Sequence, residues 1–574
     1  MNINVSNLEI EETFSKEIKI NESSSKEVFL FLVPMHVTFE SFINPYENGR
    51  SYKKKDGKSY NSLSTDIPLG PISMSAYLKK FVDVEVKLID FNVELNHTDE
   101  FPFTSFEAYC RDFLNKLDFK PNLIGVSSLF SPSLHNFIAC GQVAKEIWPE
   151  ALVVGGGNIP TNSYKQLYLE MKCNFFDAFC FGEGEKPLKD LMLSENRREF
   201  LETSNSWITK NKIEPGEFFI PKHDHIDDLD EIPFFDYDLI DVKRNAVNPV
   251  TSSFHNVKNK IGFHIMTSRG CPYLCTFCAS HRTHGRKMRY HGVDRVKADL
   301  KKLTSKYGAT QVIFQDDHLM GDKDRVHKLL KIIKDLKLNS LYQNGLTLYA
   351  LDKPMLTAFY DAGVRHLVLP VESGSEKVLK HQMRKPLKMH ISERVAADCR
   401  DLGIYTNTNI LIGMPGETKQ DIEEARINLR KIKTNWFNIA CASPLVGSDM
   451  HSIAVQGNFI SGETLGADYH HAVINTDEFS AKYIQQMQYI FNLELNFIYN
   501  QDMLAGSFET ALLGFNNVIR IRPDHAIAYY YAAICYQKLG DHESYQDAKK
   551  QFQKYSSVET WKNWIDFFNI KTLN

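Results

Sequence analysis

The sequence contains no long apolar run and no strong excess of charge of one sign, and it has few clustered cysteines. No segment approaches the roughly 18 or more apolar residues that cross a bilayer, so we expect no membrane span. Residues 1–26 are polar and lack the apolar core of a signal peptide, which favours a cytoplasmic protein. A net charge of −4 over 574 residues gives no general basic field for nucleic acid.

Cysteine is scattered except in one short stretch. Seven of the ten cysteines stand alone, and a cytoplasmic location argues against a disulfide framework. The other three, Cys271, Cys275 and Cys278, form the pattern C-x-x-x-C-x-x-C within "SRGCPYLCTFCAS". Because thiolates bind soft metals, this stretch predicts a metal site.

The residues alone leave two metals open for this site. His281 follows Cys278 by three positions and would complete a four-ligand zinc site. A [4Fe–4S] cluster normally has four cysteine ligands. With three cysteines, one iron keeps an open position for a ligand from outside the protein.

The first third of the chain alternates strand and helix patterns. This alternation predicts a doubly wound parallel sheet with helices on both faces. Ligands of such sheets bind at the carboxyl ends of the strands. The expected strands lie in Glu27–Pro34, Val84–Asn92, Pro121–Phe130, Ala151–Gly157 and Phe175–Glu185.

An acidic, proline-broken stretch, Asp227–Asp241, predicts a linker to a second alternating series. About six strand–helix units follow it, which fits a complete or partial (β/α) barrel. In such barrels the active-site residues lie on loops at the carboxyl ends of the strands. The three cysteines occupy such a loop, after the first strand of the series.

The last segment has all-α character. Gly506 and Gly540 lie 34 residues apart, and Ala511, Phe515 and Pro523 match the spacing of a tetratricopeptide repeat. An ordinary helical hairpin packed on the barrel is the alternative. The expected divisions are a flexible segment 1–26, a sheet domain 27–200, a linker 201–257, a barrel domain 258–455, a helical connector 456–495 and a helical-repeat domain 496–574.

The segment "CPYLCTFC" resembles the cluster motif of the radical S-adenosylmethionine (SAM) superfamily. The resemblance implies that Cys271, Cys275 and Cys278 hold a [4Fe–4S] cluster whose open iron binds SAM. The segments "VESGS" and "LIGMPGET" resemble SAM-binding segments of the superfamily. The segment "FQDDHL" resembles a second-strand loop whose two acids hold the SAM amino group or the substrate, or else cap the next helix. The residues implied to bind SAM are Phe277, Asp317, Glu372, Ser373, Gly374 and Gly413.

The sheet domain resembles the flavodoxin-like cobalamin-binding domain that precedes the barrel in one branch of this superfamily. Its pieces include "PLGPISMSAYLKK", "VVGGGNIPTN" and "FGEGEKPLKDL". The region has no D-x-H-x-x-G pattern, so the resemblance implies cobalamin without a histidine below cobalt. The implied cofactor contacts are Pro68, Leu69, Gly70, Ser127, Ser128, Gly155, Gly156, Gly157, Gly182, Glu183 and Gly184.

The resemblance implies a radical SAM enzyme that cleaves SAM reductively to a 5′-deoxyadenosyl radical and uses cobalamin to methylate an unactivated carbon. One alternative is cyclisation or rearrangement without methyl transfer, and another is a zinc-stapled scaffold without activity. The expected partners are a small molecule or peptide as substrate, an electron donor such as flavodoxin or ferredoxin, and a protein or peptide bound by the C-terminal helices.

Overall fold

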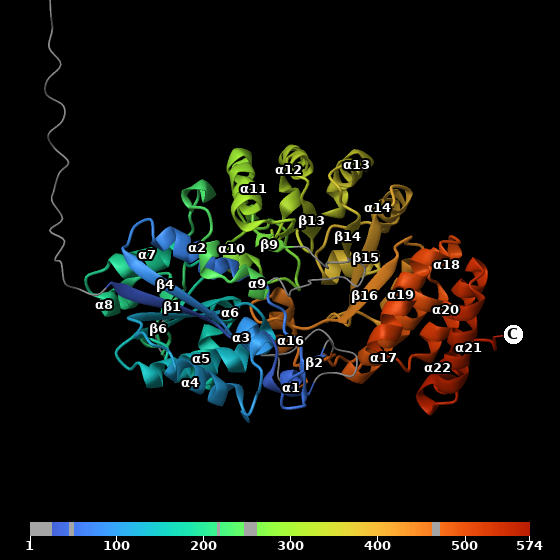
Figure 1. The fold of residues 1–574 in the computed structure, drawn as a ribbon, viewed down its shortest axis with the longest axis horizontal. Helices are drawn as coiled ribbons and strands as arrows, with labels where there is room; N and C mark the ends of the chain where they lie inside the picture. The colour runs from blue at the N-terminus through green and yellow to red at the C-terminus, as the bar shows by residue number, and fades with distance from the viewer. Residues whose placement is uncertain (1–25, 45–50, 215–218, 246–260, 462–470, 574) are drawn as a thin grey trace, which may run out of the picture.

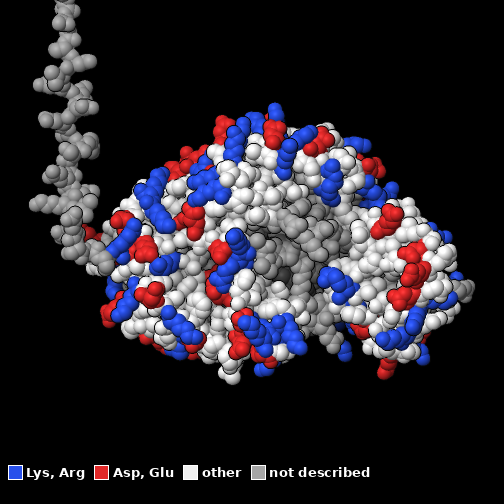
Figure 2. All heavy atoms as spheres, viewed as in Figure 1, with Lys and Arg blue, Asp and Glu red and all other residues white. Residues whose placement is uncertain are grey.

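The structure is a computed structural model that describes residues 26–44, 51–214, 219–245, 261–461 and 471–573. Figure 1 shows three parts: a front domain with a central sheet, a barrel-like domain ringed by helices, and a bundle of C-terminal helices. In Figure 2, side chains of both charges are interspersed over the visible face of the molecule. Within the described ranges, no helix is long and apolar enough to cross a membrane.

The front domain contains a six-stranded sheet in the order β4-β1-β5-β6-β7-β8. All neighbouring pairs are parallel except β7 and β8, which run antiparallel. The five parallel strands thus have the flavodoxin-like order that the sequence predicts. The strands are β1 (Glu27–Val33), β4 (Val84–Asp90), β5 (Leu123–Ser128), β6 (Leu152–Gly157), β7 (Ala178–Cys180) and β8 (Trp207–Ile208).

Helices cover both faces of this sheet. Successive side chains of a strand point to opposite faces, so both sets are buried. On β1, Leu30 and Leu32 pack in one hydrophobic cluster, whereas Phe29 and Phe31 pack in another. The sheet is therefore doubly wound, as the sequence predicts. The front-domain helices are α1 (Phe39–Ile43), α2 (Leu69–Leu78), α3 (Phe91–His97), α4 (Phe106–Asn115), α5 (Leu134–Ile147), α6 (Asn158–Lys165), α7 (Glu185–Leu193) and α8 (Arg197–Thr203), and the hairpin β2 (Ser51–Lys53) and β3 (Ser59–Asn61) lies apart from the sheet.

Six parallel strands form the partial barrel, in two three-stranded sheets ordered β9-β12-β13 and β14-β15-β16. The two sheets meet where β13 lies beside β14. The strands are β9 (Gly262–Ile265), β12 (Gln311–Phe314), β13 (Asn339–Tyr342), β14 (His366–Glu372), β15 (Tyr405–Ile412) and β16 (Trp436–Cys441).

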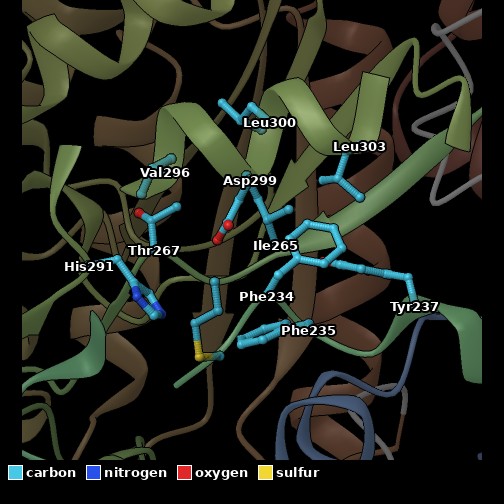
Figure 3. A pocket seen from close by; sticks show the side chains of 11 residues that line it. Phe234, Phe235, Tyr237, Ile265, Thr267, His291, Val296, Asp299, Leu300 and Leu303 are labelled. Atoms are coloured by element: carbon cyan, nitrogen blue, oxygen red, sulfur yellow. The ribbon is translucent and has the colours of Figure 1, made fainter. Parts of the chain in front are cut away.

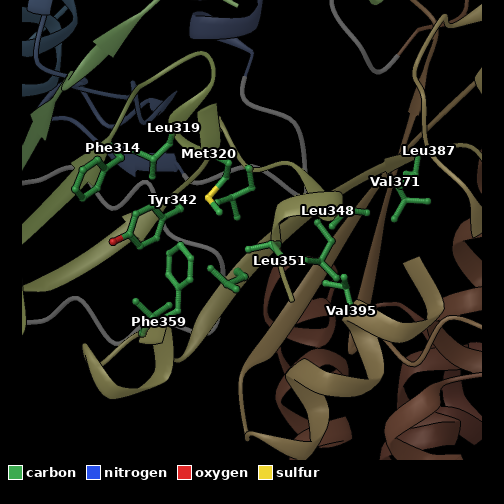
Figure 4. Close-up of a cluster of buried hydrophobic side chains, with 14 of the residues drawn as sticks. Phe314, Leu319, Met320, Tyr342, Leu348, Leu351, Phe359, Val371, Leu387 and Val395 are labelled. Carbon is green, nitrogen blue, oxygen red and sulfur yellow. The ribbon is translucent and has the colours of Figure 1, made fainter. Parts of the chain in front are cut away.

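Helices pack on the outside of these strands and close the barrel core. Figure 4 shows part of that core, in which Phe314 and Tyr342 stack between β12, β13 and the helix that carries Phe359. The barrel helices are α11 (Val293–Tyr307), α12 (Lys323–Asp335), α13 (Lys353–Asp361), α14 (Met389–Asp401), α15 (Lys419–Leu429) and α16 (Asp449–Gln456).

The stretch Asp227–Asp241, which the sequence assigns to a linker, is folded against the barrel. Leu229, Ile232 and Tyr237 belong to the barrel's hydrophobic cluster. Together with α11 this stretch encloses a cavity of about 30 Å³ (Figure 3), which has room for about one water molecule. The linker continues through α9 (Val242–Asn245), and residues 246–257 of the expected linker lie outside the described residues, as do residues 1–25.

The C-terminal helices begin by covering β16, the last strand of the barrel. Asn496 exchanges two hydrogen bonds with the backbone of Phe437, at 2.8 and 2.9 Å, and so covers an edge that would otherwise be open. The helical character is as predicted, while the repeat assignment remains a prediction. The helices are α17 (Ala481–Leu493), α18 (Gln501–Leu504), α19 (Phe508–Ile521), α20 (Ala526–Leu539), α21 (His542–Ser556) and α22 (Glu559–Phe567).

Candidate cluster and cofactor sites

The three cysteines lie on a loop that follows β9, as the sequence predicts. The loop starts at β10 (Ser268–Arg269), passes through the short helix α10 (His281–His284) and returns at β11 (Arg289–Tyr290), which pairs antiparallel with β10. Gly270 has a φ of +92°, and a Cβ added there would meet the carbonyl oxygen of Lys287 at 2.3 Å. Only glycine fits this turn into the cysteine loop.

The three thiols are half-buried and close enough to influence one another. Burial raises the pKa of Cys271 and raises that of Cys275 to about 11; Cys278 adds to both shifts, and Cys271 adds to that of Cys275. As free thiols, Cys271 and Cys275 are therefore protonated, and metal binding must displace those protons. Among the described residues, no three His, Cys, Asp or Glu side chains converge on a point suited to one metal ion. A cubane cluster needs no such convergence, because each cysteine binds a different iron.

Three barrel loops hold the cysteine loop in place. The ring of Tyr273 lies edge-on to His318, which follows β12, at 5.1 Å. The backbone N–H of Thr276 donates to the carbonyl of Met383 after β14, at 3.0 Å, and the carbonyl of Thr276 accepts from Met450 in α16, at 2.8 Å. The cysteines thus lie where loops from the carboxyl ends of several strands meet.

The adjacent acids after β12 have different roles. Asp316 is fully buried and accepts hydrogen bonds from the Thr267 backbone and hydroxyl and from the Ser268 hydroxyl, at 2.6–3.2 Å, so it anchors the start of the loop. Asp317 has a buried Oδ2 without a hydrogen-bond partner, and its charge raises the pKa of Cys271. An unpartnered buried carboxylate oxygen beside the cysteines fits a cationic ligand.

Glu372 ends β14 in a strained conformation. Its φ is +72°, and the strand register shifts between Pro370 and Glu372. Strain of this kind in a residue other than glycine persists where the surroundings enforce it, typically at functional sites. Glu372 pairs with Lys385 at 3.3 Å, and both act electrostatically on Cys275. The sequence analysis did not single out Lys385, because nothing in its local sequence places it beside the cluster loop.

The remaining barrel residues implied to bind SAM have structural partners. A Cβ at Gly374 would meet the backbone of Ala425 at 2.4 Å, and one at Gly413 would meet Ile484 at 2.8 Å. Ser373 is buried and accepts a hydrogen bond from the Ser375 backbone, at 3.2 Å. Phe277 is partly buried against the barrel core.

Most glycines implied to contact cobalamin are required by packing. A Cβ at Gly155 would meet Phe179 at 2.7 Å, and one at Gly157 would meet the carbonyl oxygen of Ser128 at 2.2 Å. A Cβ at Gly182 would meet His223 at 2.7 Å, and one at Gly184 would meet Met74 at 2.4 Å.

Two other glycines of the front domain face open space. A Cβ at Gly70 or Gly156 would meet no atom within 4 Å. On the neighbouring strand β5, Ser127 is half-buried and lies beside Gly156 in register. The loop that follows exposes large apolar side chains at Leu129 and Phe130. Open backbone beside exposed apolar side chains at the carboxyl ends of the strands fits a large, partly apolar ligand.

Three further residues implied to contact cobalamin lie at the same end of the sheet. Pro68 is the N-cap of α2, which begins at Leu69, and Leu69 is partly buried against the barrel core. The hydroxyl of Ser128 is buried and lies 2.5 Å from that of Ser133, so it has a protein partner.

Glu183 faces the barrel. Its buried carboxylate accepts hydrogen bonds from Arg289 at 2.5 and 2.9 Å, pairs with Arg269 at 3.1 Å and lies 2.8 Å from Nδ1 of His284. All three partners belong to the hairpin that carries the cysteines. Local sequence could not reveal this contact, because the acid and the bases are about 100 residues apart and no pattern links them.

Two family profiles match the chain on these two domains. The profile of the B12 binding domain matches residues 66–192, and that of the Radical SAM superfamily matches residues 265–426, which include the three cysteines. The chain carries a B12-binding domain followed by a radical SAM domain. A radical SAM domain implies a [4Fe–4S] cluster and SAM, and a B12-binding domain implies cobalamin.

The chain is similar to curated proteins and to a solved structure over much of its length. The chain is 26% identical to cytidylyl-2-hydroxyethylphosphonate methyltransferase of Streptomyces wedmorensis, over 69% of this chain and 79% of that protein. It is 24% identical to an anaerobic magnesium-protoporphyrin IX monomethyl ester cyclase of Rubrivivax gelatinosus, over 58% of each chain. Its fold resembles that of OxsB, a cobalamin-dependent SAM radical enzyme, with a TM-score of 0.59, 14% identity and coverage of 96% of this chain and 82% of that one.

The residues present fit the implied cofactors. The radical SAM domain offers three half-buried thiols, an unpartnered oxygen of Asp317 and a strained Glu372 on one group of loops. The B12-binding domain offers an open edge at Gly70, Gly156 and Ser127. Nothing in the chemistry of either donor set opposes its cofactor.

Proposed function

We propose that the protein is a cobalamin-dependent radical SAM methyltransferase acting on an unactivated carbon. The observation that carries this proposal is the contact between the two domains: the loop with Cys271, Cys275 and Cys278 lies directly on the B12-binding domain through Arg269 and Glu183. A cluster bound by that loop and a corrin bound by that domain would therefore lie close to each other. The similarity to a curated methyltransferase supports the same reaction class.

When bound, the cluster and SAM would supply the radical that abstracts hydrogen from the substrate, and cobalamin would supply the methyl group. The chain positions them. Cys271, Cys275 and Cys278 are proposed as the cluster ligands. Asp317 and Glu372 are proposed as polar contacts of SAM, in which the carboxylate of Asp317 accepts hydrogen bonds from the cationic amino group.

Several backbone segments complete the proposed cofactor contacts. Phe277, Ser373, Gly374 and Gly413 would border SAM, since they lie on the loops that surround the cysteines. On the B12-binding domain, the open positions Gly70, Gly156 and Ser127 would approach the corrin and its nucleotide tail most closely. Pro68, Leu69, Ser128, Gly155, Gly157, Gly182 and Gly184 would shape this edge through packing.

A second candidate is cyclisation or rearrangement without methyl transfer, because the chain is also similar to an anaerobic magnesium-protoporphyrin IX monomethyl ester cyclase. Either reaction needs a one-electron donor of the flavodoxin or ferredoxin type. A cytoplasmic location and recruitment of a peptide or protein by the C-terminal helices remain part of the proposal.

The test is anaerobic turnover of the reconstituted full chain with SAM and a reductant, with and without hydroxocobalamin. Methyl transfer from SAM to cobalamin predicts 5′-deoxyadenosine together with S-adenosylhomocysteine in an amount that matches the bound cobalamin, and no S-adenosylhomocysteine without cobalamin. Formation of 5′-deoxyadenosine without S-adenosylhomocysteine would contradict methyl transfer and favour the cyclase alternative. Once a substrate is known, a gain of one methyl group in the product separates the two reactions.

A further inference from the structure

Two glutamates on the loop after β7 are buried against the radical SAM domain. The side chains of Glu183 and Glu185 are 3% and 4% exposed. A buried carboxylate is costly unless it is paired, so its partners determine its role. Burial alone would raise the pKa of Glu183, but Arg269, His284 and Arg289 together hold that pKa well below its usual range.

The second glutamate shares a partner with the first. Glu185 accepts hydrogen bonds from Arg269 and from the hydroxyl of Ser73 in α2, both at 2.6 Å. Arg269 therefore bridges Glu183 and Glu185 with its two terminal nitrogens. Because a guanidinium donates in a fixed planar geometry, this arrangement fixes the direction of the Arg269 side chain.

The cationic partners all belong to the hairpin that carries the cluster ligands. Arg269 ends β10 two residues before Cys271, and Arg289 lies opposite it in β11. His284 ends α10, which lies between these strands. A displacement of either arginine therefore moves the start of the cysteine loop.

Neutral contacts join α10 both to the B12-binding domain and to the stretch that follows it. The hydroxyl of Thr283 donates to Oδ1 of Asn158, which directly follows Gly157, at 2.7 Å. The Nε2 atoms of His225 and His223 lie 3.1 and 2.7 Å from the carbonyl oxygens of Thr283 and Arg282. These contacts thus connect the cysteine hairpin to the end of β6, where Gly156 faces open space.

We propose that Glu183, Glu185, Arg269, Arg289 and His284 form a carboxylate clamp that fixes the cluster loop at a set distance from the corrin. The clamp residues are positioning residues, because they act through the hairpin and not on substrate or cofactor. The part of the proposal that concerns the corrin rests on the proposed function. The part that concerns the hairpin does not, since it follows from contacts within the chain.

The first measurement is hydrogen–deuterium exchange across residues 268–290 of the full chain, in cluster-free and reconstituted protein. Glu183→Gln keeps the shape of the side chain and removes its charge. We expect exchange in the hairpin to quicken by about tenfold, because the arginines lose their buried counter-charge. The matched control is Asp224→Asn, which breaks the partly exposed Lys186–Asp224 pair near the same loop and should change hairpin exchange by less than about twofold.

A gentler variant covers the case in which Glu183→Gln does not fold. Ser73→Ala removes the hydrogen bond that the hydroxyl donates to Glu185 and the one that it accepts from Arg269, and it leaves every charge of the clamp in place. We expect it to quicken hairpin exchange by about two- to fivefold. If neither variant changes hairpin exchange, the clamp is refuted.

The second measurement tests positioning directly. In reconstituted protein, pulsed electron paramagnetic resonance reports the distance between the reduced cluster and cob(II)alamin. The clamp predicts one narrow distribution in the native chain and in Asp224→Asn, and a broader one in Glu183→Gln and Ser73→Ala at unchanged iron and cobalamin content. An equally narrow distribution in all four proteins would overturn the positioning role. Failure of the native chain to bind cluster or cobalamin would refute the proposed function, whereas exchange in the cluster-free chain would still judge the hairpin contact.

Discussion

The B12-binding and radical SAM domains place their candidate residues at the same kind of position, the carboxyl ends of parallel strands, but by different means. In the B12-binding domain the motif consists of glycines, and Gly155 and Gly157 are required by neighbouring atoms. In the radical SAM domain the positions with the clearest ligand character are polar: Asp317 has an unpartnered oxygen, and Glu372 is strained.

This difference shows which motif residues can identify a ligand site. A glycine permits both close packing and close approach of a ligand, so its presence does not distinguish the two. A buried polar atom without a partner has no packing explanation and points to a missing partner. Within the glycine motifs, only the positions with open space, Gly70 and Gly156, have the same diagnostic value.

The largest expected effect comes from removing a cluster ligand. Cys275→Ala should lower iron content and SAM cleavage at least about 100-fold, because thiolate ligation is the cluster's attachment to the protein. Cys399→Ala, which removes a buried thiol from α14, is the control and should retain its iron. Iron analysis and 5′-deoxyadenosine assays provide the readouts. Equal losses in both variants would mean that the loop thiols have no special role.

Asp317 tests the role of the polar residues in the radical SAM domain. Asp317→Ala should raise the KM for SAM by about 10–100-fold, the effect of losing one charge-assisted hydrogen bond. Asp324→Ala, on the exposed surface of α12, should leave KM unchanged. Steady-state kinetics at varied SAM concentrations measures both. An unchanged KM in Asp317→Ala would remove this residue from the site.

The adjacent residues Gly155 and Gly156 test the role of the glycines in the B12-binding domain. Gly155→Ala should destabilise the B12-binding domain by about 1–3 kcal/mol, since its Cβ would overlap Phe179. Gly156→Ala should change stability by less than about 0.5 kcal/mol and weaken cobalamin binding about tenfold. Chemical denaturation and cobalamin titration separate the two effects. If Gly156→Ala binds cobalamin normally, the open edge is not the corrin contact.

A perturbed residue far from both cofactors provides the smallest expected effect. His525 is buried between Trp561 and Phe497, with Arg522 and Asp524 nearby, and burial lowers its pKa from 6.5 to about 3. Its stabilising contribution is complete above pH 6.5 and is lost as the pH falls towards the folded pKa. At pH 5 the loss should be about 2 kcal/mol.

The variant His525→Gln separates this residue from other histidines. Its thermal melting, followed by circular dichroism, should depend less on pH between 7 and 5 than that of the native chain. Identical pH dependence in the two proteins would contradict this assignment. A confirmed effect would show that a strongly shifted pKa marks burial here and not a ligand site.

The layer architecture could be predicted because it depends on local patterns. The strands at Glu27–Val33 and Val84–Asp90 alternate or form short apolar runs, and their order along the chain limits the sheet to few topologies. The cysteine loop was equally predictable, since its three cysteines lie within eight residues.

The contacts between domains could not be predicted, because they join residues far apart in sequence. Glu183 was assigned to a cofactor edge from its place in a glycine motif, yet its carboxylate binds Arg269 and Arg289 of the radical SAM domain. The folding of the stretch Asp227–Asp241 against α11 was missed for a related reason. Its apolar residues have no regular period and become meaningful only beside their partners.

Anaerobic reconstitution of the full chain with iron, sulfide and hydroxocobalamin tests the central claim most directly. The account predicts about four irons per chain in a cubane cluster. It also predicts that the electron paramagnetic resonance spectrum of the reduced cluster changes when SAM is added, because SAM binds the open iron. Bound zinc without iron, or a cluster whose spectrum does not respond to SAM, would contradict it.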